Sequence, residues 1–288
     1  MGVDELKDPI SCVFYILIAK IFFFKLTNLS PNLKRGKLMG SQLGSNNSEE
    51  IELSHEKPGV TVNFINIHQK PVGQLILKNA ACPNGICRFG SGTLISSDLF
   101  LTAAHCFKKG ESCKCELSFD FWCAPGCLPI SKSSVSFNFQ NASPNSPPIQ
   151  PIEREKIFSI RERVETDESL DYLILRLNGS PGNTYGYAKI SPVDVRRNDK
   201  IFIIGHPNQS IKKVAVGRVK ELNEKKIYYD VATKEGSSGS GIIDATSGNI
   251  VGIHVSNPNT SVYPNLKVGI KISALLRSSP TLRNLAGL

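Results

Sequence analysis

Residues 235–241 read Glu-Gly-Ser-Ser-Gly-Ser-Gly, a run that encloses serines between glycines. Two other stretches complete the pattern: residues 102–106 read Thr-Ala-Ala-His-Cys, and residues 171–177 read Asp-Tyr-Leu-Ile-Leu-Arg-Leu. A serine in a tight turn, a histidine among small residues and an aspartate that opens an apolar strand are the parts of a nucleophile, base and carboxylate relay. They follow one another in the order histidine, aspartate, serine, at nearly equal spacings.

Each of these groups has a task in acyl transfer. His105 would take the proton of the Ser238 hydroxyl and later deliver it to the leaving group, while Asp171 would accept from the other ring nitrogen and fix the tautomer. The backbone N–H groups of Gly236 and Ser238 would converge on the developing oxyanion. Glycines at positions 236 and 239 allow the sharp turn that this convergence needs. Together these residues predict a catalytic site.

Taken one at a time, the three stretches have ordinary explanations. A Gly/Ser-rich run such as residues 235–241 is typical of a flexible loop or linker. A single histidine such as His105 is commonly a satisfied turn residue, and Asp171 alone would serve as a turn or strand-start cap. Their occurrence together, in this order, favours the catalytic interpretation.

The order His, Asp, Ser is that of chymotrypsin-type enzymes, and the sequence resembles that family elsewhere too. Residues 91–95 and 101–106 resemble the histidine segment of trypsin-like serine peptidases. The C-terminal third is similar to the bacterial glutamyl endopeptidases, and the resemblance as a whole covers roughly residues 60–275. The segments that carry the narrower likeness are 205–207 (Gly-His-Pro), 211–230, 230–233 (Asp-Val-Ala-Thr) and 252–254 (Gly-Ile-His).

This resemblance implies an all-β fold of two six-stranded antiparallel Greek-key barrels with a short C-terminal helix. It implies a serine endopeptidase that hydrolyses peptide bonds through the His105/Asp171/Ser238 triad and a covalent acyl-enzyme. Protein or peptide substrates are expected, with no cofactor and no catalytic metal. The alternative is a catalytically inactive homologue that acts as a binding or surface domain.

The narrower likeness also predicts a specificity. In the glutamyl branch a threonine five residues before the nucleophile and a histidine on the following strand line the substrate pocket, and Thr233 and His254 stand at those places. With Ser256 they form the expected substrate-binding set, which predicts cleavage after Glu or Asp, because hydroxyl and imidazole groups can donate to a carboxylate. Ser256 and Asn257 replace the glycines of that branch. The alternative is that His254 and Thr233 are ordinary strand residues.

Three other positions depart from the family pattern. Ser237 precedes the nucleophile where trypsins carry the aspartate that pairs with a new N-terminal amine, so activation of the trypsin kind is not expected. Gly241 replaces a proline after the nucleophile loop and adds backbone freedom. Gly90 stands where the usual cysteine partner of Cys106 would be, with Cys82 and Cys87 the nearest alternatives.

Apolar and β-branched runs between Gly, Pro, Asn and Ser predict many short strands after residue 60. A Pro/Ser/Asn loop at 144–151 separates the two halves, no internal repeat is legible, and a helix is expected near 273–276. The expected strands are 60–67, 72–78, 93–95, 99–102, 135–139, 170–177, 200–204, 214–219, 226–231, 250–255 and 267–272.

The N-terminal part of the chain differs in composition. Residues 1–36 form a hydrophobic signal or anchor segment, residues 37–59 a linker or pro-segment, and residues 60–288 the peptidase domain. Residues 9–24 are apolar except for Lys20, about the length of a signal h-region. The sequence leaves open a secreted or periplasmic protein, membrane attachment through residues 9–26, and a misassigned start or buried helix.

The cysteine content and the net charge limit which cellular compartment and which binding partners are expected. Cys12 lies in the N-terminal segment and the other seven cysteines fall between positions 82 and 127, a clustering that favours loop disulfides in an oxidising compartment. Zinc binding by residues 113–127 is the alternative, although the spacings differ from Cys-x2-Cys pairs. The net charge of +9 comes from scattered lysines and arginines without interleaved aromatics, so nucleic-acid binding is not expected.

Overall fold

The computed structural model describes residues 49–50, 60–78, 82, 85–107, 130–140, 156–256 and 263–288. The hydrophobic segment 1–36, nearly all of the 37–59 linker, the 144–151 loop and the cysteines at 113–127 lie outside these residues. Within the described part of the chain, no helix combines the length and apolarity that a membrane crossing requires.

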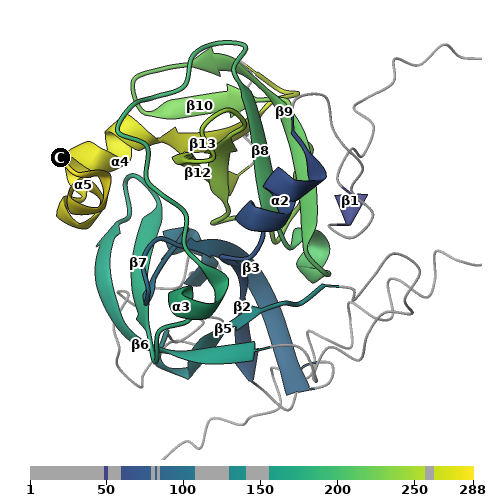
Figure 1. Cartoon of the computed structure of the whole chain (residues 1–288), viewed down its shortest axis with the longest axis vertical. Coiled ribbons are helices and arrows are strands. Elements are labelled where there is room, and N and C mark those ends of the chain that lie inside the picture. Colours follow the sequence, from purple (N-terminus) through teal and green to yellow (C-terminus); the bar gives the residue numbers. More distant parts are fainter. Residues whose placement is uncertain are drawn as a thin grey trace, which may run out of the picture. The chain divides into compact units, whose positions relative to one another are not determined.

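Six strands close into the first barrel, in the order β2-β3-β4-β7-β6-β5, with every pair antiparallel (Figure 1). Strands β2, β4 and β7 are buried at nearly every position, on both of their faces. The strands are β2 (Val72–Lys78), β3 (Ile86–Leu94), β4 (Leu99–Thr102), β5 (Ser133–Phe137), β6 (Lys156–Asp167) and β7 (Tyr172–Leu177).

The second barrel repeats this topology. Its order is β8-β9-β10-β13-β12-β11, and β8 closes the ring by pairing with both β9 and β11. In each barrel the strands therefore follow the order first, second, third, sixth, fifth, fourth, and the expected double-barrel fold is confirmed. The strands are β8 (Lys200–Gly205), β9 (Lys213–Leu222), β10 (Lys226–Tyr229), β11 (Gly241–Asp244), β12 (Ile250–Ser256) and β13 (Lys267–Lys271), and β1 (Glu49–Glu50) pairs with β9.

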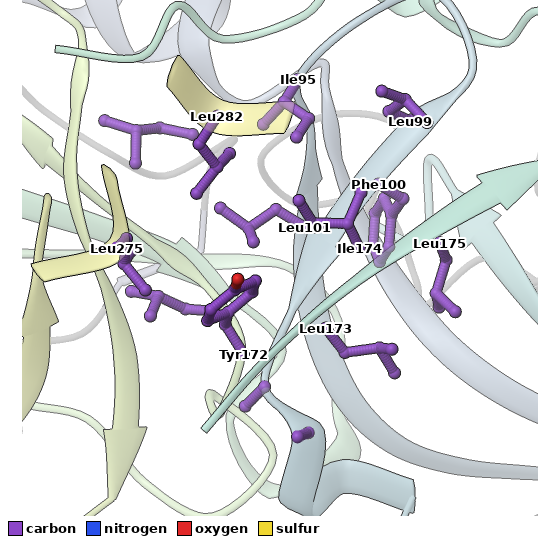
Figure 2. Close-up of a cluster of buried hydrophobic side chains, with 14 of the residues drawn as sticks. Ile95, Leu99, Phe100, Leu101, Tyr172, Leu173, Ile174, Leu175, Leu275 and Leu282 are labelled. Atoms are coloured by element: carbon purple, nitrogen blue, oxygen red, sulfur yellow. The ribbon is translucent and has the colours of Figure 1, made fainter. Parts of the chain in front are cut away.

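Two short helices follow the second barrel and pack on the first. Leu275 of α4 (Ile272–Ser278) and Leu282 of α5 (Pro280–Ala286) are fully buried in one cluster with Tyr172 of β7 (Figure 2). Ser279 separates the helices because its hydroxyl caps α5, accepting from the Leu282 N–H at 3.0 Å, and Pro280 starts the next helix. The expected single C-terminal helix is therefore a pair.

The strand predicted at residues 60–67 is wrong, because α2 (Val62–His68) occupies this segment. Thr61 caps the helix by accepting from the Phe64 N–H at 3.2 Å. Only Ile65 is fully buried in α2, so its apolar residues do not alternate between two faces. The prediction also omitted β6, where every residue except Ile160 is exposed or half-buried, and β11, which is short and directly follows the glycine-rich run. The remaining short helices are α3 (Gly182–Tyr185), η3 (Ala104–Phe107), η4 (Ile130–Lys132) and η5 (Pro207–Gln209).

The described cysteines settle how Cys106 is bonded. Cys82 and Cys87 form a disulfide with each other, and Cys106 is a free, buried cysteine. Burial, with a smaller contribution from the Asp171 charge, raises the pKa of the Cys106 thiol to about 12. A Cβ atom built on Gly90 would lie 2.8 Å from the Cys106 sulfur and 3.4 Å from its Cβ. Gly90 therefore occupies the position from which a bridging cysteine would reach Cys106.

We expect Gly90→Cys to form a disulfide with Cys106 under oxidising conditions, since the Cβ separation is close to the usual span of about 3.5–4.5 Å. Closing a loop of this length should stabilise the fold by about 2–4 kcal/mol, less any strain from the Leu75 side chain beside the new Cβ. Urea unfolding with and without reductant measures the effect, and Gly90→Ser is the control with the same Cβ but no bond. If the thiols at positions 90 and 106 both remain free in the oxidised variant, this geometry is contradicted.

Candidate active site

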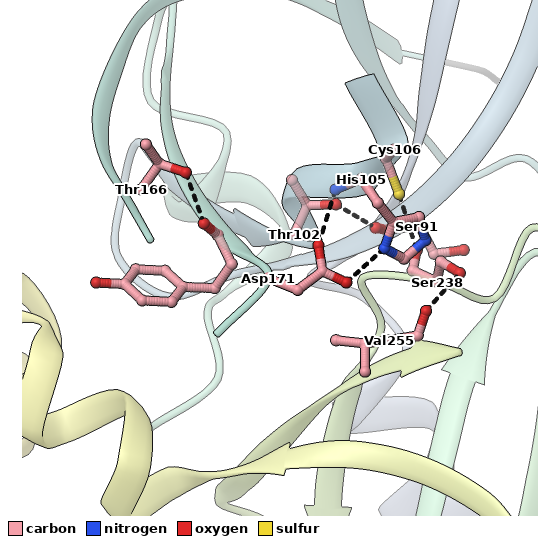
Figure 3. Close-up of polar contacts among 9 residues, drawn as sticks. Ser91, Thr102, His105, Cys106, Thr166, Asp171, Ser238 and Val255 are labelled. Carbon is pink, nitrogen blue, oxygen red and sulfur yellow. Dashed lines mark hydrogen bonds and ion pairs between the residues drawn. The ribbon is translucent and has the colours of Figure 1, made fainter. Parts of the chain in front are cut away.

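His105 and Asp171 are both carried by the first barrel. His105 lies in η3, directly after β4, and Asp171 ends the turn between β6 and β7. The His105 Nδ1 atom lies 2.6 Å from Asp171 Oδ2, and the His105 backbone N–H donates to Asp171 Oδ1 at 2.8 Å (Figure 3). The carboxylate thus holds both the ring and the backbone of His105. With its proton on Nδ1, the ring keeps a lone pair on Nε2.

The turn that presents Asp171 is held in a strained conformation. Asp171 has φ of +52°, in the left-handed region that non-glycine residues seldom adopt. Asp167 supports the turn, since its Oδ1 accepts from the N–H groups of Ser169 at 2.9 Å and Leu170 at 3.2 Å, and its Oδ2 accepts from the Ser278 hydroxyl of α4 at 2.6 Å. Burial opposes ionisation of Asp167, but the hydrogen bonds from Ser278 and Ser169 outweigh it and lower the pKa. Sequence analysis missed this support.

Ser238 comes from the second barrel, in the loop between β10 and β11. Gly236 and Gly239 of this loop have φ of +91° and +89°. A Cβ on Gly239 would collide with the backbone oxygen of Ser91 and the side chain of Thr102, so the loop lies directly against the first barrel. Ser91 fixes it there: its N–H donates to the Ser238 carbonyl at 2.9 Å and its hydroxyl to the Gly236 carbonyl at 2.8 Å.

The loop that carries Ser238 contains two backbone N–H groups without a hydrogen-bond partner in the described residues. Among the hydrogen bonds of the described residues, none uses the backbone N–H of Gly236 or Ser238. The Ser238 hydroxyl donates to the Val255 carbonyl at 3.2 Å and makes no hydrogen bond to His105. In the view of Figure 3, the His105 ring lies between the Asp171 carboxylate and the Ser238 side chain.

The residues expected in the substrate pocket lie at one end of the second barrel. Thr233 is 7% exposed, and its hydroxyl oxygen is buried without a hydrogen-bond partner in the described residues. His254 of β12 is 3% exposed, and its Nδ1 lies 2.6 Å from the hydroxyl of Tyr229 on β10. Ser256 ends β12, where its backbone pairs with Val268, and Asn257 lies outside the described residues. Tyr229, which sequence analysis missed, contacts the histidine.

His254 is held neutral. Its pKa is lowered to about 3, mainly by burial and then by the positive charge of Lys267. Burial also holds the pKa of Tyr229 well above its usual value, so the hydroxyl stays protonated. The Tyr229 hydroxyl has two acceptors, His254 Nδ1 at 2.6 Å and the Val268 carbonyl at 3.1 Å. When it donates to Nδ1, the neutral ring carries its proton on Nε2.

A second buried histidine lies behind the nucleophile loop. His206 is fully buried, its Nδ1 is 3.0 Å from the Ser210 carbonyl, and burial followed by the charge of Lys212 lowers its pKa well below the usual value. Its backbone N–H donates to Ser91 Oγ at 2.9 Å. In the described ranges, no three potential ligands from His, Cys, Asp and Glu are grouped as a metal site would require.

Comparisons with known proteins agree with this architecture. The profile of the trypsin-like peptidase domain matches residues 90–253. A search of curated protein sequences finds no relative that matches this chain.

Several solved structures share the fold. A Glu endopeptidase in complex with MPD is 17% identical, with a TM-score of 0.52 over 85% of this chain and 97% of the other. A protease from M. tuberculosis in its active form is 14% identical, with a TM-score of 0.50 over 76% and 82% of the two chains. A serine endoprotease from Yersinia pestis is 14% identical, with a TM-score of 0.51 over 77% and 66%.

The matched profile spans more than half of the chain and includes strands of both barrels. At these low identities, the solved structures add evidence for the fold alone. On this evidence the chain belongs to the trypsin-like peptidase family and is a serine endopeptidase with a chymotrypsin-like fold.

Proposed function

We propose that the protein hydrolyses peptide bonds through a His105/Asp171/Ser238 triad and a covalent acyl-enzyme. The observation that carries this proposal is the double hydrogen bond of Asp171 to the ring and backbone of His105. It holds the imidazole with Nδ1 as the donor, so that Nε2 can accept the Ser238 proton. The Ser238 oxygen then bonds to the scissile carbonyl carbon, and His105 returns the proton to the departing amine. Water, deprotonated by the same Nε2, releases the acyl group.

The backbone N–H groups of Gly236 and Ser238 would bind the oxyanion of each tetrahedral intermediate. Both donors are unused by the described residues, and both lie in the loop in which Gly236 and Gly239 have positive φ. Such preorganised donors are worth about 10²–10³ in rate each. The Ser238 hydroxyl must leave the Val255 carbonyl to reach His105, a rotation about one side-chain bond. Catalytic hydrogen bonds are often loose before substrate binds.

We propose further that the enzyme cleaves after Glu, and less readily after Asp. The buried Thr233 hydroxyl lacks a partner, which a substrate carboxylate would supply. The neutral His254 ring, with Nδ1 accepting from Tyr229, would donate from Nε2 to the same carboxylate, and Ser256 would complete the pocket at the end of β12. One of the structurally similar proteins is itself named a Glu endopeptidase.

Ser238→Ala is expected to abolish peptide hydrolysis, with a loss on the order of 10³-fold or more, because the nucleophile is removed. The unfolding midpoint should change little. Ser240→Ala is the matched control: it lies in the same loop, and its buried hydroxyl has no hydrogen-bond partner in the described residues. Labelling of the wild-type chain by a fluorophosphonate probe should disappear only in Ser238→Ala. A wild-type chain that neither labels nor hydrolyses peptides would indicate an inactive homologue that acts by binding.

A peptide library should show cleavage predominantly after Glu. His254→Ala is expected to reduce the preference for Glu over large apolar residues, because the carboxylate loses a donor. Tyr229→Phe should act in the same direction through the orientation of His254. A wild-type profile dominated by Lys, Arg or apolar residues before the cut would reject the proposed specificity and leave the triad unaffected.

The neutral state of His254 predicts how stability depends on pH. Its folded-state pKa of about 3 lies below the value of roughly 6.5 in the unfolded chain, so the unfolded state takes up a proton that the native state does not. The resulting stability is present above pH 6.5 and is lost as the pH falls towards 3, at roughly 1.4 kcal/mol per pH unit. The lowered pKa of His206 makes the free energy of unfolding depend on pH in the same direction.

Urea unfolding between pH 6 and pH 5 measures this slope, before most carboxylates titrate. His254→Gln should reduce the slope by about half, since His206 supplies the other part. An unchanged slope would mean that His254 is protonated in the native pocket.

A further inference from the structure

Lys267 shares a face of the second barrel with the pocket residues. It begins β13, and the register places it directly opposite Tyr229 of β10. On the other side of β13, Gly269 lies opposite His254 of β12. Because side chains alternate along a strand, residues 267 and 269 face the same way, and residues directly opposite on a neighbouring strand share that face. The contact between Tyr229 and His254 identifies this face as the barrel interior.

The other face of β13 is already occupied. Val268 and Ile270 are 5% and 4% exposed and belong to the large apolar cluster that includes the first barrel and the C-terminal helices. Lys267 is partly buried at the start of the strand, at the same end of the barrel as Ser256. Its side chain therefore begins beside Tyr229, on the face of the sheet that also carries His254.

The electrostatics agree with this placement. Burial and, after it, the charge of Lys267 lower the pKa of His254. Burial lowers the pKa of Lys267 itself. A neutral imidazole and a hydroxyl offer hydrogen bonds but no charge, whereas a carboxylate leaving water needs a cation or several strong donors to offset its lost hydration.

We propose that Lys267 is the specificity-determining cation of the substrate pocket, pairing with the side-chain carboxylate of the residue before the cut, while Thr233 and His254 donate the accompanying hydrogen bonds. This inference rests on the proposed function and adds the residue that supplies the charge. The flexible stem and compact ammonium of lysine suit such a role, since its three donors can reach a carboxylate without a fixed planar geometry.

The charge of Lys267 makes a different prediction from the hydrogen bonds of His254 and Thr233. Hydrogen-bond donors alone would accept a glutamine side chain, whose amide oxygen has nearly the position and size of a carboxylate oxygen. A cation discriminates strongly between Glu and Gln because only Glu carries the opposite charge. The ratio of kcat/KM for Glu and Gln peptides of otherwise identical sequence is therefore the measurement that isolates Lys267.

The test compares this ratio in the full-length wild-type chain, Lys267→Met and Lys267→Glu. Lys267→Met should lower the Glu/Gln ratio by about tenfold to a hundredfold, because a charge-assisted bond is lost. Lys267→Glu should lower it further and raise the relative cleavage after Lys. Lys226→Met, an exposed residue opposite Ile270 on β10, is the matched control and should leave the ratio unchanged.

Fluorophosphonate labelling of each variant distinguishes a failure of the proposed triad from a failure of the proposed specificity. A wild-type chain that does not label contradicts the triad, whereas a chain that labels but does not favour Glu contradicts the specificity. Labelling of Lys267→Met with an unchanged Glu/Gln ratio overturns the role of Lys267 alone. Should Lys267→Met fail to fold, Lys267→Arg is expected to keep the ratio and Lys267→Gln to lower it, and equal ratios in these two variants would overturn the inference.

Discussion

The contact between Ser91 and the nucleophile loop is the constraint on which the rest of the site depends. Ser91 is fully buried in β3, and its backbone and hydroxyl together bind the carbonyls of Ser238 and Gly236. This close approach leaves no room for a side chain at Gly239, whose Cβ would meet the first barrel. The loop of one barrel is thereby positioned against the histidine of the other, with buried hydrogen bonds that are costly to break.

The C-terminal helices α4 and α5 help to position the Asp171 carboxylate. Asp171 has a left-handed backbone that only a well-supported turn can maintain. Its support comes from Asp167, which caps the turn and is bound by Ser278 of α4, and from Glu165, which accepts from the Tyr172 hydroxyl at 2.6 Å and from the Thr281 N–H of α5 at 3.3 Å. The end of the chain therefore braces the strand pair that presents Asp171 to His105.

The two histidines of the site have opposite environments. The His105 side chain is 41% exposed, and its Nδ1 lies 2.6 Å from the Asp171 carboxylate. His254 is buried, bonded to Tyr229 and held neutral by burial and by nearby positive charge. The same side chain is thus accessible to solvent in one place and a buried, neutral hydrogen-bonding group in the other.

The sequence by itself determined the family features that depend on local chemistry: the glycines of the nucleophile loop, the order of His105, Asp171 and Ser238, and most of the strands with continuous apolar runs. It did not reveal the helix at residues 62–68, the exposed strand β6 or the repeated strand order, because capping and strand pairing outweigh short apolar runs. Tyr229, Asp167 and Lys267 also carry no local signal. Their neighbours are set by strand register and by the docking of α4, so only the tertiary structure decided which residues they lie beside.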